Sequence, residues 1–577
     1  MQSVSAVVTR VLEDVGGHSE RWADVLDEMP HLPLTDRRRV FERLSTLVDE
    51  GALAATERES MWKSLRKLIG LHREYSDADW ALPRDEVDRL EELASRMAPE
   101  SAYSRSLWLF TDHMPHLGNG AKKTDHAVYD SELAAQRRDA VGAIVAEGGL
   151  EQVRRLAEES VVPWAVGVAL ADATGNTHEE DLLPLVGSQD RSRAELAFAY
   201  FGRRFEEGGW DWLLEVMDAH ESLTEDQQAR LLLSTRDFPA SWEAADARGE
   251  GVGRAFWASF VPLGLGRDFG HVLLVAERLI AVGRKAAALD FLGIYRNQGG
   301  APEEAVADLV ARGLDGLLAT QDTDPEFDRL SSYDYEQLFE LLERNRAALG
   351  EDRLAGLEWA YLPALGLHPD VPTLYAWMAK DPRFFTEIVA AVFRRTSGDD
   401  EMALEPKDEA NRQRRAENGY RLLTSWSRPP GLLEDGKMDA SVLRAWVEEA
   451  RTLLAEQDRA DIGDSQIGQV LATSPPDEDG SWPGETVRDL IEELASEPLE
   501  SGFTTAVFNH RGTTIRAPYE GGSQEMDLVR KYRSEAERFA DRWPRTAALL
   551  RKLADSYEHD ARREEKRAER FRRGLEP

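Results

Sequence analysis

The sequence predicts an all-α protein, an irregular α-solenoid of helical hairpins of the tetratricopeptide or HEAT kind, with a small mixed C-terminal module. Three observations support this fold class. Apolar residues recur at steps of three and four along most of the 577 residues, which is the spacing of one helical face. Glycine or proline interrupts these runs roughly every ten to twenty residues, as turns between helices require. No repeat of fixed length emerges, so the array is predicted to be irregular.

Residues 1–111 are predicted to form an N-terminal helical domain. One apolar face passes through Val40, Leu44 and Leu47, and another through Trp62 and Leu65. The first 17 residues lack the basic start and continuous apolar core of a signal peptide and are predicted to form a short amphipathic helix. A cytoplasmic location is therefore the expectation. Residues 112–130 are rich in glycine and polar residues without helical period, and we expect a loop there.

Residues 131–395 are predicted to form the hairpin array. The pairs Gly148-Gly149 and Gly208-Gly209 are expected to end helices. The clearest hairpin is predicted at residues 271–296, where Gly283 makes the turn between two apolar faces. A lone hairpin cannot bury both of its faces, so neighbouring hairpins must stack on it. Several compact helical bundles joined by loops would give the same sequence signals.

Residues 396–473 are predicted to continue the helices after a mobile loop at residues 396–416, where an acidic run precedes a basic one. Residues 474–484 contain several prolines and glycines and are predicted to be a linker. The C-terminal module is expected at residues 482–577. Within it, residues 501–557 combine glycine turns with a long helix, and Trp543-Pro544 is predicted to mark a helix boundary.

The composition limits the classes of function. With 107 acidic and 71 basic residues the formal charge is −36, which disfavours binding to nucleic acid or anionic membranes except at a local basic patch. The absence of cysteine excludes disulfides, thiolate zinc sites and cysteine nucleophiles. No apolar run approaches the roughly 18 residues that span a bilayer, so no membrane association is expected. The local signatures of common hydrolases and nucleotide enzymes are also missing. We expect no cofactor.

Histidines in the loop at residues 112–130 are weak candidates for a metal site. His113, His116 and His126 accompany Asp112 and Asp125, and imidazole and carboxylate groups suit zinc or iron. A solvated loop explains the same residues, because short spacings within a loop do not fix ligand geometry. The sequence therefore assigns no metal ligand and no catalytic residue.

Basic residues near glycine turns form the main binding candidate. They are Arg511, Arg516, Arg530, Lys531 and Arg533, and they lie close to Gly512 and Gly521-Gly522 in the sequence. Guanidinium groups beside exposed backbone amides can receive a carboxylate or a phosphate. Pairing of these residues with the acidic body of the protein is the alternative.

Residues 62–83 and the C-terminal module contain four short motifs, Trp80-Ala-Leu-Pro83, Gly521-Gly-Ser-Gln-Glu525, Lys531-Tyr-Arg533 and Trp543-Pro-Arg-Thr546. On these motifs, the two regions resemble helical regions that follow nucleoside-triphosphatase or other effector domains in very large bacterial antiphage-defence proteins. The resemblance implies that the helical array senses or binds a partner while an attached domain does the chemistry. This chain departs from that pattern, because no effector domain is visible in it.

The leading hypothesis is a non-enzymatic α-helical scaffold or sensor that binds protein partners, including a separate effector subunit, in bacterial antiphage defence. Long surfaces of helical arrays suit that role. One alternative is a metal-dependent or hydrolytic enzyme whose site is assembled from dispersed His, Asp and Glu residues. A second alternative is nucleic-acid binding through the C-terminal basic patch.

Overall fold

The computed structural model describes residues 2–51, 53–262, 268–295, 302–320, 329–366, 369–398, 406–512, 516–517 and 519–573. Within these ranges the chain forms helices and no strand, and one isolated antiparallel bridge pairs Leu432 with Met438. The prediction of an all-α protein is confirmed for this part of the chain. The chain divides into two compact units, Met1–Leu263 and Gly264–Pro577. That division falls inside the predicted hairpin array and was not expected from the sequence.

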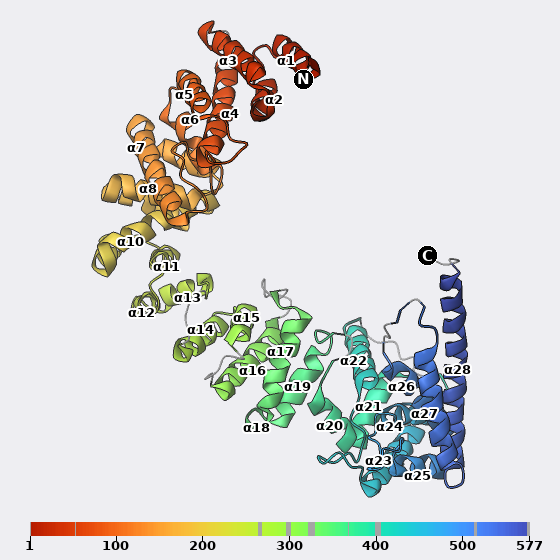
Figure 1. The fold of residues 1–577 in the computed structure, drawn as a ribbon. Helices are drawn as coiled ribbons and strands as arrows, with labels where there is room; N and C mark the ends of the chain where they lie inside the picture. The colour runs from red at the N-terminus through yellow and green to blue at the C-terminus, as the bar shows by residue number, and fades with distance from the viewer. Residues whose placement is uncertain are drawn as a thin grey trace. The chain divides into compact units, whose positions relative to one another are not determined.

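The first unit begins with a bundle of helices (Figure 1). Its apolar core completely buries Trp22, Leu44 and Leu65, so both predicted apolar faces point inward. Pro33 and Pro83 immediately precede two of the helices, where the fixed proline φ suits the chain entering a helix. The bundle contains α1 (Gln2–Asp14), α2 (Ser19–Glu28), η1 (Met29–His31), α3 (Leu34–Asp49), α4 (Ala55–Glu74) and α5 (Arg84–Met97).

Helices of the rest of the first unit pack against their neighbours in the sequence. The predicted breaks are confirmed, because Gly149 (φ 69°) and Gly209 (φ 66°) interrupt α7 and α10 with backbone angles that favour glycine. The helices are α6 (Ala102–Ser106), η2 (Leu107–Phe110), α7 (His126–Glu159), α8 (Pro163–Thr174), η3 (Gly175–His178), α9 (Glu179–Leu182), η4 (Leu183–Gly187), α10 (Arg191–Ala219), α11 (Glu225–Ser234), α12 (Ala240–Ala247) and α13 (Glu250–Ser259).

The second unit begins with the predicted hairpin. It forms from α14 (Phe269–Ala281) and α15 (Lys285–Tyr295), with Gly283 between them at φ 89°. The following helices are α16 (Glu303–Thr320), α17 (Ser332–Arg344), α18 (Arg346–Leu349), α19 (Glu351–Tyr361), α20 (Pro372–Lys380), α21 (Pro382–Val392), α22 (Pro406–Ser425), α23 (Ala440–Glu456) and α24 (Ala460–Leu471).

Helix α22 corrects part of the loop predicted at residues 396–416. Its first half, which includes Arg412 and Arg415, is helical, while residues 399–405 lie outside the described residues. This segment is so polar that it shows no helical period of apolar residues, and the helix could not be recognised from that pattern. Glu, Arg, Gln and Ala nevertheless have high helix propensity, which explains why the segment folds this way.

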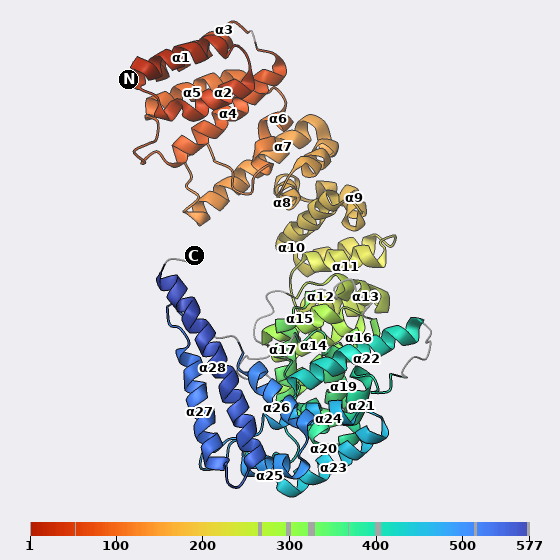
Figure 2. The ribbon, with the colours of Figure 1, turned by 90° about the vertical axis from the view of Figure 1, so that its right-hand side faces the viewer.

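In the described residues, the C-terminal part of the second unit forms helices joined by turns and irregular segments, and no strand. Its helices are α25 (Glu485–Leu494), α26 (Glu497–His510), α27 (Ser523–Phe539) and α28 (Pro544–Arg572). The mixed character predicted for residues 482–577 is therefore not confirmed, and residues 513–515 and 518 lie outside the described part. The predicted boundary at Trp543-Pro544 is confirmed, because Pro544 is the first residue of α28. Figures 1 and 2 show α27 and α28 side by side.

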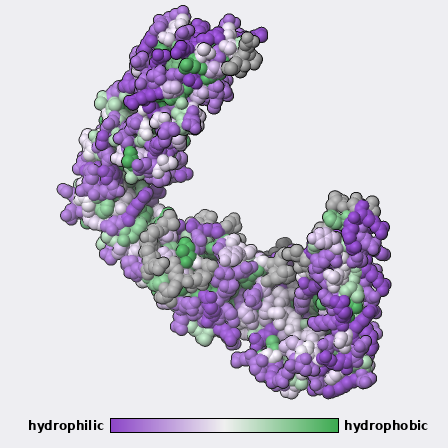
Figure 3. Space-filling model, viewed as in Figure 1, coloured by the Kyte–Doolittle hydropathy of each residue, from purple (hydrophilic) through white to green (hydrophobic). Residues whose placement is uncertain are grey.

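Hydrophilic side chains cover most of the face shown in Figure 3, and hydrophobic side chains form only small scattered areas on it. In the described ranges, no helix combines the length and the apolar character needed to cross a membrane.

Candidate functional site

Helix α1 carries an apolar face that its own bundle covers only in part. Val8, Leu12 and Val15 are buried at 8%, 7% and 1% exposure. On the same face, Val7 and Val11 are 61% and 42% exposed. Because residues three and four apart share a helical face, these five side chains form one continuous apolar stripe. Part of that stripe faces solvent.

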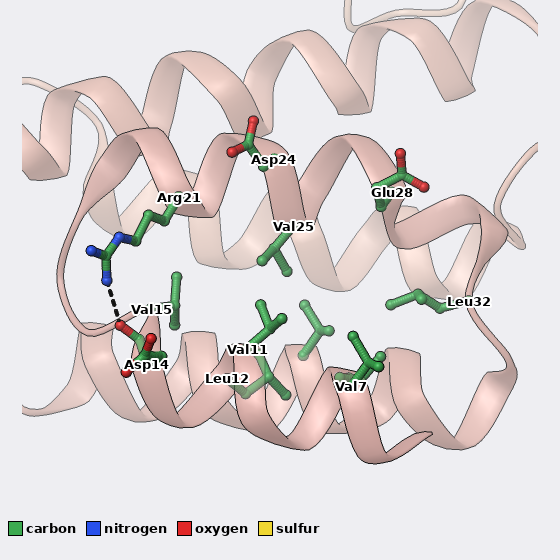
Figure 4. Close-up of a pocket in the computed structure, with 12 residues that line it drawn as sticks. Val7, Val11, Leu12, Asp14, Val15, Arg21, Asp24, Val25, Glu28 and Leu32 are labelled. Carbon is green, nitrogen blue, oxygen red and sulfur yellow. Dashed lines mark hydrogen bonds between the residues drawn. The ribbon is translucent and has the colours of Figure 1, made fainter. Parts of the chain in front are cut away.

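A groove lies between the exposed edge of this stripe and α2 (Figure 4). Its cavity volume is about 660 Å³, and Val25 and Leu32 line the side opposite Val11. Figure 4 shows Val25 directed across the gap towards the side chains of α1. The volume falls within the range of roughly 300–1,000 Å³ that is typical of ligand-binding clefts.

Acidic residues form the rim of the groove. Asp24 and Glu28 of α2 line the groove and are exposed, and Figure 4 shows their carboxylates directed away from α1. Asp14 lies at the end of α1. Arg21 also lines the groove, and its Nη1 donates a hydrogen bond of 2.8 Å to the backbone oxygen of Asp14. The groove thus combines an apolar floor with more carboxylates than cations at its edge.

Polar contacts on another side of α1 hold this wall in place. Ser5 Oγ donates to Asp36 Oδ1 at 2.7 Å, and the Asp36 residue is 1% exposed on α3. Arg39 Nη2 donates to Thr9 Oγ1 at 2.8 Å. In the loop after α1, Trp22 Nε1 donates to the Gly16 oxygen at 3.0 Å. The groove wall is therefore attached to the bundle by specific hydrogen bonds as well as by packing.

The predicted arginines at the C-terminus are paired with carboxylates. Arg511 Nη2 and Arg516 Nη2 contact the same Glu525 oxygen at 2.5 and 2.6 Å, and Arg516 also lies 3.6 Å from Glu564. Burial raises the pKa of Glu525, but hydrogen bonds from Arg516 and Arg511 outweigh that effect and hold the pKa below its usual value. Glu525 therefore joins α27 to the segment that follows α26.

The other predicted binding residues are on α27. Arg530 pairs with Asp527 one turn earlier, and Arg533 lies 2.6 Å from Glu558 and 3.4 Å from Asp555. These pairs correspond to the alternative reading of intramolecular pairing. Lys531 differs, because its Nζ lies 5.9 Å from the centre of the Trp482 ring and 5.7 Å from that of Tyr532. That geometry suits cation–π attraction.

Lys531 and Arg511 line a second cavity, with a volume of about 410 Å³. We call it the aromatic pocket, because Trp482, Tyr532 and Tyr557 form much of its wall. The loop after α24, the end of α26 and the helices α27 and α28 all contribute to it. The structure thus brings together two of the five predicted binding residues in one pocket.

The histidine candidates have separate environments. His113 and His126 are exposed, whereas His116 Nδ1 lies 2.6 Å from Glu74, a residue that is 1% exposed. Glu74 also accepts a hydrogen bond from the Lys123 backbone at 3.2 Å. In the described part of the chain, no group of three or more His, Asp or Glu side chains is placed to hold a metal ion. His116 thus attaches the loop to α4.

Sequence reasoning did not identify the α1–α2 groove. An amphipathic helix at the N-terminus was predicted, and the valine-rich stripe was the signal that could have indicated a binding face.

Comparison of the chain with family models, with curated proteins and with solved structures finds no match.

Proposed function

We propose that the protein is a non-enzymatic α-helical scaffold or sensor, and that its α1–α2 groove binds an amphipathic helix of a partner protein. The observation that carries this proposal is the exposure of Val7 and Val11 on a groove wall whose other apolar residues, Val8, Leu12 and Val15, are buried. Two branched apolar side chains exposed to water do not stabilise the isolated protein. Burying them against a partner would stabilise the complex.

A helix is the partner element that fits best. Grooves between two helices commonly receive the apolar face of a third helix, through side chains spaced three, four and seven residues apart. The α1 wall has the same spacing, with Val7, Val11 and Val15 in one row. A helix laid along the groove would extend the local helical packing of the bundle.

The charge of the rim specifies the partner further. Asp14, Asp24 and Glu28 line the groove beside its apolar floor, together with the cation Arg21. Lysine or arginine residues flanking the apolar face of the partner would complement these carboxylates. Exposed pairs of this kind add little affinity but set orientation and exclude acidic competitors.

The order of helix packing supports the wider part of the proposal, an irregular solenoid. Helices α7, α8 and α10 pack in succession, as do α14, α15 and α16. Arrays of this type present long surfaces for partners. The resemblance to helical regions of antiphage-defence proteins supports a role in bacterial defence, with the chemistry done by a separate effector subunit.

Binding of a designed peptide tests the groove directly. The probe is a fluorescent peptide of about 18 residues, longer than the roughly 12–15 residues below which isolated helices are marginal. It carries leucines on one face and lysines on both flanks. We expect a dissociation constant on the order of 10 µM by fluorescence anisotropy, equivalent to about −7 kcal/mol. Val11→Asp should weaken binding at least tenfold.

Three controls make this result specific. Val128→Asp introduces the same change at a valine that is 52% exposed on α7 of the same unit, and it should leave binding unchanged. A scrambled peptide of identical composition, and a peptide with glutamate in place of lysine, should each bind at least tenfold more weakly. Equal binding of the scrambled peptide would refute a helix-binding groove. A dimer that Val11→Asp dissociates in sedimentation would also refute it, because the occupant would be a second copy.

A further inference from the structure

The aromatic pocket has a charge opposite to that of the protein as a whole. The chain carries a formal charge of −36, yet the described residues that line this pocket include Arg511 and Lys531 and no carboxylate. Desolvation lowers the pKa of His510, which also lines the pocket, so its imidazole is uncharged at neutral pH. Glu525, which is not among the lining residues, forms an ion pair with Arg511. A negatively charged ligand would therefore meet an attractive local field in an otherwise repulsive protein.

The walls of the pocket suit a flat ring. The rings of Tyr532 and Tyr557 are stacked at 5.8 Å with an angle of 14°, and the Trp482 ring lies 6.3 Å from Tyr532. Burial raises the pKa of Tyr532 to about 12 and also raises the pKa of Tyr557. Both phenols remain protonated at neutral pH and add no negative charge to the pocket.

Cations lie beside these rings. The guanidinium carbon of Arg511 is 5.3 Å from the centre of the Tyr557 ring, and Lys531 Nζ approaches Trp482 and Tyr532. Arg511 is fixed by its contact with Glu525, whereas the side chain of Lys531 is exposed and can turn towards a bound anion. A ring-binding surface and an anion-binding group are thus adjacent.

We propose that the aromatic pocket binds a small ligand in which a planar ring carries an anionic group, as in a nucleoside monophosphate or an aromatic carboxylate. The ring would lie against Trp482 or Tyr532 and the anion would contact Lys531. The volume of about 410 Å³ accommodates a ligand of this size and lies within the usual range for small-molecule sites. This site lies in the second unit and does not depend on the groove in the first.

Calorimetric titration of the full chain with four probes tests the proposal. Adenosine monophosphate and 1-naphthoate each combine a ring with an anion, whereas adenosine lacks the charge and inorganic phosphate lacks the ring. We expect at least one of the two combined probes to bind at least tenfold more tightly than adenosine and phosphate. Which of them binds more tightly indicates whether the pocket favours a nucleotide or an aromatic carboxylate.

Two variants assign the binding to this pocket. Lys531→Gln should weaken the combined probe about tenfold, which corresponds to about 1.4 kcal/mol, while Lys566→Gln makes the same charge change at an exposed position of α28 and should have no effect. Leu528→Trp places a larger side chain in the half-buried lining and should abolish binding. Absence of binding by all four probes at millimolar concentration would overturn the proposal. So would binding that neither Lys531→Gln nor Leu528→Trp changes.

Discussion

Gly502 of α26 lies against the backbone of Ser465 in α24 so closely that a Cβ on Gly502 would be 1.9 Å from the Ser465 oxygen. The reverse contact is equally close, because a Cβ on Gly468 would lie 2.0 Å from the Leu499 oxygen. Two helices can approach this closely only where the crossing point lacks side chains. This crossing helps to position α26, whose end contributes His510 to the aromatic pocket.

The first prediction concerns this helix crossing. Gly502→Ala should lower the free energy of unfolding by about 1–3 kcal/mol, because the added methyl group must push two helices apart. Gly356 of α19 is the matched control, since a Cβ there would meet nothing within 4 Å. Gly356→Ala should stabilise the protein by about 0.5–1 kcal/mol. Denaturant unfolding of both variants checks the prediction, and equal effects would contradict it.

Adjacent residues of α1 should differ sharply in their effect on stability. Leu12 is buried, and Leu12→Ala should cost about 2–5 kcal/mol. Val11 is 42% exposed, so Val11→Ala should change the free energy of unfolding by no more than about 0.5 kcal/mol. Thermal unfolding of the two variants measures this difference. A large cost at Val11 would show that its side chain serves the fold rather than a partner.

The pH dependence of stability should reveal the titration of the Glu358 carboxyl, which lies on α19 and is 1% exposed. Its oxygens accept hydrogen bonds from the backbone of Thr373 and Leu374 at 3.3 and 2.8 Å, but burial dominates and raises the pKa of Glu358 from 4.5 to about 8. Between these values the unfolded chain releases the proton while the folded protein retains it. This carboxyl therefore contributes most to the free energy of unfolding below pH 4.5, and that contribution is lost as the pH rises to about 8.

Glu358→Gln should remove that decline, because the amide has the same shape and does not titrate. Stability measured by denaturant unfolding from pH 5 to pH 8 should fall less steeply for the variant than for the unmodified protein. Parallel curves for the two proteins would contradict the raised pKa.

Glu525 should show the opposite dependence on pH. Its lowered pKa means that its stabilising effect is present above pH 4.5 and is lost as the pH falls through the folded pKa. Glu525→Gln should cost about 3 kcal/mol at neutral pH, near the lower end for buried pairs, because Arg511 and Arg516 are 20% and 21% exposed. The loss of stability on acidification should also become shallower.

The exposed pair on α27 is the control for Glu525. Asp527 and its partner Arg530 are 70% and 68% exposed, so Asp527→Asn should cost less than about 1 kcal/mol. Urea unfolding at pH 7 and pH 4 compares the two variants. If Glu525→Gln costs no more than Asp527→Asn, the proposed role of Glu525 in joining the two segments is wrong.

Much of the local helical structure could be predicted from the sequence. The hairpin at residues 271–296 follows from two apolar faces around Gly283, and the start of α28 follows from the conformational limits of Pro544. The breaks at Gly149 and Gly209 were also predictable, because glycine tolerates the positive φ that interrupts a helix. These features depend on residues close to one another in the chain.

The candidate sites depend on contacts that local patterns do not contain. Whether Val11 faces core or solvent is decided by how much of α1 is covered by α2 and α3. The C-terminal arginines gave a basic pattern, but Arg516 meets Glu525 and Glu564 only after the helices have packed. Trp482 and Tyr557 likewise reach one pocket from segments far apart in the sequence.

Site-specific crosslinking in cells can show whether a partner protein occupies the α1–α2 groove. A photoreactive amino acid replaces Val11 in one variant and Val128 in another, and both are illuminated in the cells that naturally produce the protein. We expect an adduct at residue 11 alone, mapped by mass spectrometry to an amphipathic helix with lysine or arginine beside its apolar face. No adduct, the same adducts at both positions, or an adduct with a second copy of this chain would contradict it.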